Sequence, residues 1–271
     1  MKFFFISLIF LTVSCGKSSK NNELVKSIDR VVDDKCQDKL DAKVIIDDLY
    51  WYDFSDASNY TEYLNSKTVG QLYIPTTRSR CTAFIVNKNT IMTNNHCVGS
   101  SISANGVKLK IRDLGSDPIS YTCSKFIMTD RVLDFTLLEC NENIGDIYGV
   151  NILSNKSASF DDQIYVIQEN CDYNSDPYCS VNKMIATGSI EQTGKYIIGH
   201  NADTLGGSSG SPIYNATTNE VIAIHNAGSV TNARNYGVPM DKIIEKISTT
   251  LPALKIHKKR EQNPDIDGPC K

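Results

Sequence analysis

The sequence predicts an all-β protein built as a barrel or a pair of barrels. Between residues 44 and 251, short runs rich in Val, Ile, Tyr, Phe and Thr alternate with Asn, Gly, Ser and Asp. These runs are not separated by long amphipathic helices, which argues against a parallel sheet with crossover helices. Hydrophobic residues make up 41% of the 271-residue chain, so the composition is that of a globular protein.

About eleven segments qualify as strands, each bounded by turn residues. In chain order they are GQLYIP, CTAFIV, TIMTNN, VKLKIRDL, ISYTCSKFIM, FTLLEC, QIYVIQ, KYIIGH, SPIYN, EVIAIH and YGVPM. One helix is expected after them, in DKIIEKIST. Asp241 is its candidate N-cap, and Ile243, Ile244 and Ile247 share one face.

Charge and metal-ligand spacing exclude two classes of function. The formal net charge is −3, whereas binding to phosphates requires a basic surface, so nucleic acid is not expected as a partner. The chain has no C-x-x-C pair and its four histidines are scattered. We therefore expect neither a metal site nor a cofactor.

The chain begins with the features of an export signal. Lys2 precedes an apolar run from Phe3 to Val13, which predicts a signal peptide over residues 1–15. The segment LTVSC resembles a bacterial lipobox, in which Cys15 would become the lipidated N-terminus; the alternative is an ordinary cleaved signal with an incidental cysteine. The expected location is outside the cytoplasm, either as a membrane-anchored lipoprotein of the cell envelope or as a secreted protein.

Residues 16–67 are polar and read as a lead or propeptide-like segment, residues 68–251 as the folded domain, and residues 252–271 as a polar tail. The nine cysteines become eight once Cys15 is removed or lipidated, an even number that suits four disulfides in an oxidising compartment. We expect the protein to be a monomer.

Three residues in order suggest nucleophilic catalysis. His96 follows an apolar strand in TIMTNNHCVG, Asp134 precedes one in DRVLDFTLLEC, and Ser209 lies in DTLGGSSGSP. A serine hydroxyl needs a histidine to take its proton and a carboxylate to orient that histidine. Each residue alone has an ordinary structural explanation, but the order His, Asp, Ser is one of the known arrangements of such a triad.

These segments resemble the chymotrypsin-like serine protease family over residues 68–250. TNNHCV is similar to its Thr-Ala-Ala-His-Cys box, DFTLLE to its Asp-hydrophobic-small-Leu-Leu box, and GGSSGSP to its Gly-Asp-Ser-Gly-Gly-Pro box. The resemblance implies two packed six-stranded antiparallel β-barrels with a C-terminal helix. It also implies a trypsin-like serine endopeptidase that acts on proteins or peptides.

The resemblance assigns roles to individual residues. Pro212 fixes the register, so that Ser209 is the nucleophile, His96 the general base and Asp134 its orienting carboxylate. The backbone N–H groups of Gly207 and Ser209 would form the oxyanion hole. The pair Cys81–Cys97 matches the disulfide that braces the histidine loop of the family.

Two departures from the family boxes stand out. Ser208 occupies the place where trypsin carries an aspartate that pairs with a newly cut N-terminus, so activation by that ion pair is not implied. Asn94 and Asn95 replace two alanines before the histidine, and asparagine there resembles the bacterial glutamyl endopeptidase branch.

The substrate side chain before the scissile bond has two candidate recognition groups. Asp203 lies where trypsin binds Lys or Arg, which would give a Lys/Arg-specific protease. Thr204 and His225 lie where the glutamyl endopeptidases bind a carboxylate, and we favour this preference for Glu over Asp. The backbone of residues 226–228, including Asn226 and Gly228, would pair with an extended substrate.

The remaining disulfides are open, because eight cysteines allow 105 connectivities. The candidate pairs are Cys171–Cys179 around a short loop, Cys123–Cys140 on either side of Asp134, and Cys36–Cys270 between the tails.

Two other functions remain as alternatives. G-x-S-x-G centred on Ser208, followed by Asp241 and His257, is the chain order of an α/β-hydrolase esterase. A catalytically silent binding module on the protease fold is the other.

Overall fold

The computed structural model describes residues 45–46, 50–114, 116–170, 182–254 and 256. All of them belong to one unit of the chain, residues 38–271. The expected signal peptide, Cys15, the pairs Cys36–Cys270 and Cys171–Cys179, and His257 lie outside the described residues.

Two seven-stranded sheets make up the described fold. The strands of the first sheet, in chain order, are β2 (Val69–Ile74), β3 (Ser79–Asn87), β4 (Thr90–Thr93), β5 (Lys108–Ile111), β6 (Ile119–Thr122), β7 (Lys125–Asp130) and β8 (Phe135–Glu139). Those of the second are β1 (Trp51–Asp53), β9 (Gln163–Asn170), β10 (Asn182–Gln192), β11 (Ile198–His200), β12 (Pro212–Asn215), β13 (Val221–Ser229) and β14 (Arg234–Pro239).

The first sheet has the strand order β6-β5-β2-β3-β4-β8-β7, with every ladder antiparallel. Its strands β4 and β8 are buried along nearly their whole length, whereas β5 alternates exposed and buried residues. That alternation is the two-residue period of a strand with one face exposed to solvent. Between the described strands no ladder joins β6 to β7, so this sheet forms a half-barrel.

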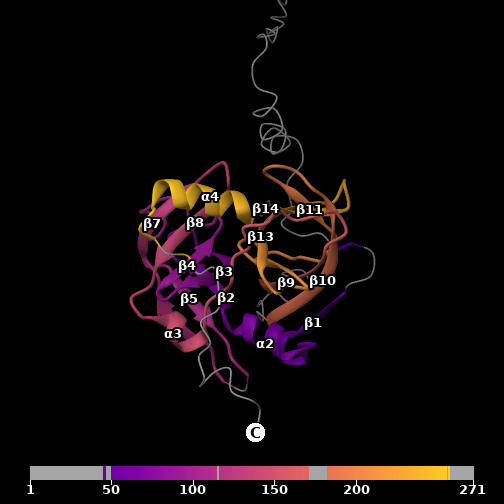
Figure 1. The fold of residues 1–271 in the computed structure, drawn as a ribbon. Helices are drawn as coiled ribbons and strands as arrows, with labels where there is room; N and C mark the ends of the chain where they lie inside the picture. The colour runs from indigo at the N-terminus through magenta and orange to yellow at the C-terminus, as the bar shows by residue number, and fades with distance from the viewer. Residues whose placement is uncertain (1–44, 47–49, 115, 171–181, 255, 257–271) are drawn as a thin grey trace, which may run out of the picture. The chain divides into compact units, whose positions relative to one another are not determined.

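The second sheet closes on itself. β9 pairs with both β10 and β12, which joins β9, β10, β11, β14, β13 and β12 into a six-stranded antiparallel barrel. β1 adds to the edge of β10. In Figure 1 the labels β4, β5, β7 and β8 lie on the left, and those of the second sheet on the right.

Three helices and a 3₁₀ turn accompany the strands in the described part of the chain: η2 (Phe54–Asp56), α2 (Tyr60–Lys67), α3 (Ile144–Tyr148) and α4 (Met240–Thr250). The predicted C-terminal helix is therefore present, with Ile243 and Ile247 buried and Ile244 packed beside them. Its N-cap is Pro239, not Asp241, which lies inside the first turn and accepts a hydrogen bond from Ser157.

The folded part of the chain begins earlier than the expected boundary at residue 68. β1 pairs with β10, and α2 buries Leu64. α2 is capped by Asn59, whose side chain accepts from the N–H of Glu62 at 2.9 Å. The lead assigned to residues 16–67 therefore includes structured elements of the same unit.

Side chains from both sheets meet in one hydrophobic cluster. It includes Phe84 and Leu137 from the first sheet, and Tyr165 and Tyr214 from the second, whose rings stack with centroids 4.7 Å apart. α4 follows the second sheet, yet its Lys246 pairs with Asp130 of β7 at 3.0 Å. This packing fixes how the two sheets face each other, and the predicted fold class, a chymotrypsin-like double barrel with a C-terminal helix, is confirmed.

Candidate active site

His96 and Asp134 lie together at the ends of neighbouring strands of the first sheet. His96 Nδ1 is 2.8 Å from Asp134 Oδ2, and the backbone N–H of His96 donates to Asp134 Oδ1 at 3.0 Å. The Asp134 carboxylate thus contacts His96 through both of its oxygens, which fixes the position and the rotation of the imidazole ring. Since Nδ1 faces Asp134, Nε2 is the ring nitrogen left for a reacting group.

Asp134 adopts a left-handed backbone conformation, with φ of 42°, at the turn into β8. Aspartate tolerates this region better than most residues. Asn94 supports the turn, because its side-chain amide donates to the Asp134 carbonyl at 2.8 Å. Asn95, the other asparagine noted before the histidine, donates instead to Thr129 at 2.7 Å.

A bulge in β13 brings a third side chain to Asp134. The register between β13 and β14 shifts between His225 and Ala227, so Asn226 is the extra residue. Its side-chain nitrogen lies 3.4 Å from Asp134 Oδ2. The sequence predicted Asn226 as part of a substrate-pairing edge, and its contact with Asp134 was not foreseen.

The turn that carries Ser209 is bonded to both sheets. From β3, the N–H of Thr82 donates to the Ser209 carbonyl at 2.8 Å, and the Thr82 hydroxyl donates to the Gly207 carbonyl at 2.9 Å. From β13, the His225 carbonyl accepts from the N–H of Gly210 at 2.9 Å. The Ser209 turn is therefore hydrogen-bonded to β3 of the first sheet and to β13 of the second, and Asn226 of β13 also reaches Asp134.

The Ser209 turn requires glycine at two places. Gly207 has φ of 101° and Gly210 has φ of 89°, in the region that side chains disfavour. A Cβ on Gly210 would lie 2.1 Å from the Thr82 carbonyl oxygen, and one on Gly207 would lie 2.9 Å from the Glu169 carbonyl oxygen. Among the described residues, none accepts a hydrogen bond from the N–H of Gly207 or of Ser209.

Two buried histidines face each other beside this turn. His200 Nε2 lies 3.3 Å from His225 Nδ1, and both rings are fully buried. Burial lowers the pKa of His200 to about 3. Burial also lowers the pKa of His225 well below its usual value, and the nearby His200 and His96 lower it further. Both rings are therefore neutral, and His225 Nε2 has no partner among the described residues.

Asp203 and Thr204, both expected to contact substrate, have internal partners instead. Asp203 is buried, and its two carboxylate oxygens accept from the backbone N–H groups of Ile46 and Tyr50, each at 2.7 Å. Thr204 is also buried and donates its hydroxyl to Asn235 at 2.9 Å. The trypsin-like role of Asp203 stays a prediction, and the backbone donors on both of its carboxylate oxygens were not foreseen by it.

Ser208 is also held internally. Its hydroxyl donates to Gln168 Oε1 and accepts from the N–H of Leu205 at 3.2 Å. The esterase alternative centred on this serine needs a parallel sheet, whereas every ladder between the described strands is antiparallel. That alternative is wrong.

Two disulfides join described residues. Cys81–Cys97 links β3 to the loop after His96, and Cys123–Cys140 links the ends of β6 and β8. Both pairs are among those considered from the sequence. The first joins the sequence neighbours of Thr82 and His96, two residues of the candidate site.

Two buried ionisable side chains connected to the Ser209 turn were missed by the sequence analysis. Glu169 and Lys183 are register partners on β9 and β10, and both are buried. Lys183 Nζ donates to the carbonyls of Ser66 and Arg112, at 2.8 and 2.9 Å, whereas Glu169 Oε1 has no partner among the described residues. Burial raises the pKa of Glu169 and lowers that of Lys183, and the attraction between them opposes both shifts. The N–H of Glu169 donates to the Thr82 hydroxyl at 3.0 Å, which connects the pair to the turn.

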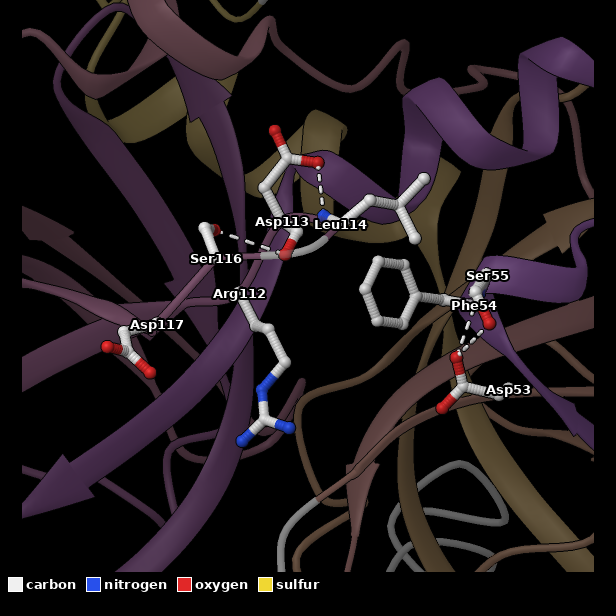
Figure 2. Close-up of a pocket in the computed structure, with 8 residues that line it drawn as sticks. All are labelled: Asp53, Phe54, Ser55, Arg112, Asp113, Leu114, Ser116 and Asp117. Atoms are coloured by element: carbon white, nitrogen blue, oxygen red, sulfur yellow. Dashed lines mark hydrogen bonds between the residues drawn. The ribbon is translucent and has the colours of Figure 1, made fainter.

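A polar pocket of 470 Å³ lies between η2 and the loop after β5. Arg112 points into it from one side, with Phe54 and Asp53 opposite (Figure 2). None of its lining residues belongs to the candidate site. Within the described ranges we find no cluster of three or more His, Cys, Asp or Glu residues suited to a metal, and no helix with the length and apolarity to cross a membrane.

Comparison with known proteins decides the family. The model of the trypsin-like peptidase domain matches residues 81–224, more than half of the chain. The chain belongs to the trypsin-like peptidase domain family. The matched region includes His96, Asp134 and Ser209, and ends at Ile224, one residue before His225.

Individual relatives of this trypsin-like chain are distant. It is 25% identical over 204 residues to secreted RxLR effector protein 73 of Plasmopara viticola, a match that covers 65% of this chain and 50% of the relative. The chain thus spans about half the length of that curated relative.

Solved structures agree on the fold. A Glu endopeptidase in complex with MPD superposes with a TM-score of 0.65 at 19% identity, covering 78% of this chain and all of the other. A serine endoprotease from Yersinia pestis superposes with a TM-score of 0.56 at 18% identity, covering 70% of this chain and 66% of the other.

Proposed function

We propose that this trypsin-like domain is a serine endopeptidase that uses His96, Asp134 and Ser209. The observation that carries the proposal is the double contact between His96 and Asp134, at 2.8 and 3.0 Å, beside a glycine-rich turn bonded to both sheets. A histidine held in this way by a carboxylate is the base that a serine nucleophile requires.

In the proposed reaction, Ser209 Oγ attacks the peptide carbonyl carbon and passes its proton to His96 Nε2. Asp134 stabilises the resulting imidazolium, and Asn226 and Asn94 hold Asp134. The oxyanion is met by the N–H groups of Gly207 and Ser209. When the C–N bond breaks, His96 protonates the leaving amine, and water then releases the acyl group by the same steps in reverse.

The nucleophile assignment is tested by labelling with a fluorophosphonate. We expect S209A to lose both labelling and peptide hydrolysis, since no other group can form the acyl-enzyme. S208A is expected to retain labelling at a reduced rate. Labelling of S209A but not of S208A would contradict the assignment and move the nucleophile to Ser208. A well-folded wild-type protein that neither labels nor cleaves would instead support the silent binding module.

We further propose a preference for an acidic residue, Glu over Asp, before the scissile bond. Its support is the neutral His225 ring, whose Nε2 has no partner among the described residues and whose Nδ1 faces His200. If His200 Nε2–H donates to His225 Nδ1, then His225 carries its own proton on Nε2, where it can donate to a carboxylate. The satisfied charge of Asp203 argues against a Lys or Arg preference.

Substrate binding also has a backbone component in this proposal. The ladder between β12 and β13 ends at Pro212 and Ile224, so residues 226–228 of β13 extend past it while still paired with β14 on the other side. Among the described strands none covers that edge. An extended substrate can add to it as a further strand.

A peptide library with varied residues before the cut tests the preference. We expect cleavage after Glu, and a roughly 10- to 100-fold loss of kcat/KM on Glu peptides in H225L, the size of a lost hydrogen bond to a charged group. Peptides with Ala at that position serve as the control and should change little. Strong cleavage after Lys or Arg would refute the preference.

We also propose that the protein acts outside the cytoplasm of a bacterium, anchored through Cys15 or secreted. The support is the apolar segment before Cys15 together with two disulfides, which persist in oxidising compartments. Mass spectrometry of the mature N-terminus decides it. A diacylated Cys15 supports the anchor, an unmodified N-terminus near residue 16 supports secretion, and an intact Met1 contradicts export.

A further inference from the structure

Asp203 is the buried carboxylate nearest in sequence to the nucleophile, and its partners come from far away. Ile46 and Tyr50, whose N–H groups it accepts at 2.7 Å each, are 157 and 153 residues distant in the chain. A buried carboxylate is costly unless each oxygen is hydrogen-bonded, and here each oxygen has a short bond. β1 begins directly after Tyr50 and pairs with β10, which holds these donors in place.

The main chain of Asp203 continues the connection toward the active site. Its carbonyl oxygen accepts from the side-chain nitrogen of Gln168 at 2.7 Å. The other end of the same amide, Gln168 Oε1, accepts from the Ser208 hydroxyl. Gln168 is fully buried, so its side chain is a fixed bridge between Asp203 and Ser208.

Ser208 in turn closes the turn before the nucleophile. Its hydroxyl accepts from the N–H of Leu205 at 3.2 Å, and its own N–H donates to the Leu205 carbonyl at 3.1 Å. Ser209 is the next residue, and Gly207 is the one before Ser208. The two proposed oxyanion donors, Gly207 and Ser209, therefore flank Ser208, whose hydroxyl is hydrogen-bonded to Gln168.

We propose that Asp203 is a positioning residue of this protease: through Gln168 and Ser208 it couples the backbone of Ile46 and Tyr50 to the turn that presents Ser209. The carboxylate serves the catalytic geometry and does not select the substrate side chain. This inference rests on the proposed function of Ser209 and deepens it.

The chemistry of the contacts separates this role from substrate recognition. A carboxylate that selects a cationic side chain must be accessible to it, whereas Asp203 is buried and both of its oxygens accept from the main chain. Loss of a positioning group affects the rate of the chemical step for every substrate. Loss of a selecting group changes the preference among substrates.

The test compares D203A, D203N and D162A in the full-length protein. Asp162 is the matched control, because its carboxylate also accepts a backbone N–H, from Ser159 at 2.8 Å, in a turn outside the candidate site. Each variant is assayed on peptides with Glu, Ala or Lys before the cut, and its melting temperature is measured alongside.

For D203A we expect kcat to fall roughly 10- to 100-fold on every cleaved peptide, with KM within about threefold of wild type, as for a group that acts in the transition state. D203N should recover part of the loss, since its amide oxygen still accepts one N–H. D162A should keep wild-type kcat. Unchanged kcat in D203A, or a changed residue preference with unchanged kcat on the best peptide, overturns the proposal.

I46P covers the case in which D203A does not fold. Proline at position 46 removes one donor to Asp203 and leaves every side chain of the network in place. A roughly threefold or larger fall in kcat, with KM retained, supports the coupling; wild-type kcat overturns it. The S209A result separates the two levels: activity retained in S209A refutes the proposed function, whereas inactive S209A with a fully active D203A refutes only the positioning role.

Discussion

Thr82→Val is the substitution that probes the contact between the two sheets at the active site most directly. The Thr82 side chain is fully buried, and its hydroxyl makes two hydrogen bonds, to the Gly207 carbonyl at 2.9 Å and from the Glu169 N–H at 3.0 Å. Valine has nearly the same shape but has no polar atom. The substitution therefore leaves one buried acceptor and one buried donor unsatisfied without creating a cavity.

Each of the two unsatisfied groups costs about 1–3 kcal/mol, so we expect T82V to lose about 2–6 kcal/mol of unfolding free energy. For a domain of this size, that loss lowers the melting temperature by roughly 4–24 °C. The Gly207 carbonyl also loses its anchor, so the N–H of Gly207 is less well aimed. We expect kcat to fall roughly 10- to 100-fold, somewhat less than when an oxyanion donor is removed outright.

Calorimetry and steady-state peptide hydrolysis measure the two effects. T82S keeps the hydroxyl and should retain most of both stability and rate. T90V is the control for a buried strand threonine, because the only hydrogen bond of the Thr90 hydroxyl to a described side chain is a long one, 3.5 Å, to Asn89. If T82V melts within about 2 °C of T82S and turns over at the same rate, the hydroxyl does not hold the turn and the reasoning is wrong.

Two further predictions concern stability. The disulfides Cys81–Cys97 and Cys123–Cys140 close loops of nearly equal length, 16 and 17 residues. Replacing either pair by alanine should therefore lower the unfolding free energy by a similar amount, about 3 kcal/mol, in thermal or urea unfolding. Only loss of the first pair should also lower kcat; equal kcat in the two double variants would contradict this. Burial tends to raise the pKa of Asp130, but the hydrogen bond from the Leu133 N–H and the nearby Lys246 lower that pKa overall. The ionised Asp130 therefore stabilises the fold at pH values above the ordinary pKa of aspartate. This stabilisation is lost as the pH falls through the lowered pKa. The unfolding free energy of D130N should therefore be lower than that of wild type by up to about 1 kcal/mol at about pH 7, and this difference should vanish near pH 2. A difference that stays constant with pH would refute the ionic contribution.

The triad segments were predictable because each carries its structural context in its own sequence. His96 follows the apolar strand that ends at Thr93, and Asp134 directly precedes the strand that begins at Phe135. Strand ends are visible as a change from apolar to turn residues, and two such ends on paired strands β4 and β8 come together through the sheet register. The structure accordingly has the two side chains in direct contact.

α2 could have been predicted and was not. Asn59 is followed three residues later by Glu62, the spacing of an N-cap with an acidic residue that closes the first turn. The surrounding polarity concealed the signal, because the segment was interpreted as a lead. His200 could also have been singled out, since it ends the predicted run KYIIGH and is one of only four histidines.

The orientations of Asp203 and Asn226 were not accessible from the sequence. Asp203 sits where a substrate-binding carboxylate is expected, and what turns it inward is main-chain N–H groups more than 150 residues away. Backbone donors have no sequence signature, so no motif can reveal them. Asn226 reaches Asp134 only because β13 bulges at that residue, and a bulge depends on the pairing of two strands rather than on either one.

The position of the Ser209 turn suggests why this chain can dispense with the aspartate that trypsin has before its nucleophile. Ser208 carries no charge, yet its hydroxyl is fixed by Gln168, and the residues on either side of it are fixed by Thr82. Neutral hydrogen bonds from two different strands thus replace one ion pair. Because β9 supplies Gln168 and β3 supplies Thr82, the geometry of the turn depends on the packing between the sheets. If Ser209 is the nucleophile as proposed, we expect this turn to form once the two sheets, and the main chain at Ile46 and Tyr50, have come together, without a later cut.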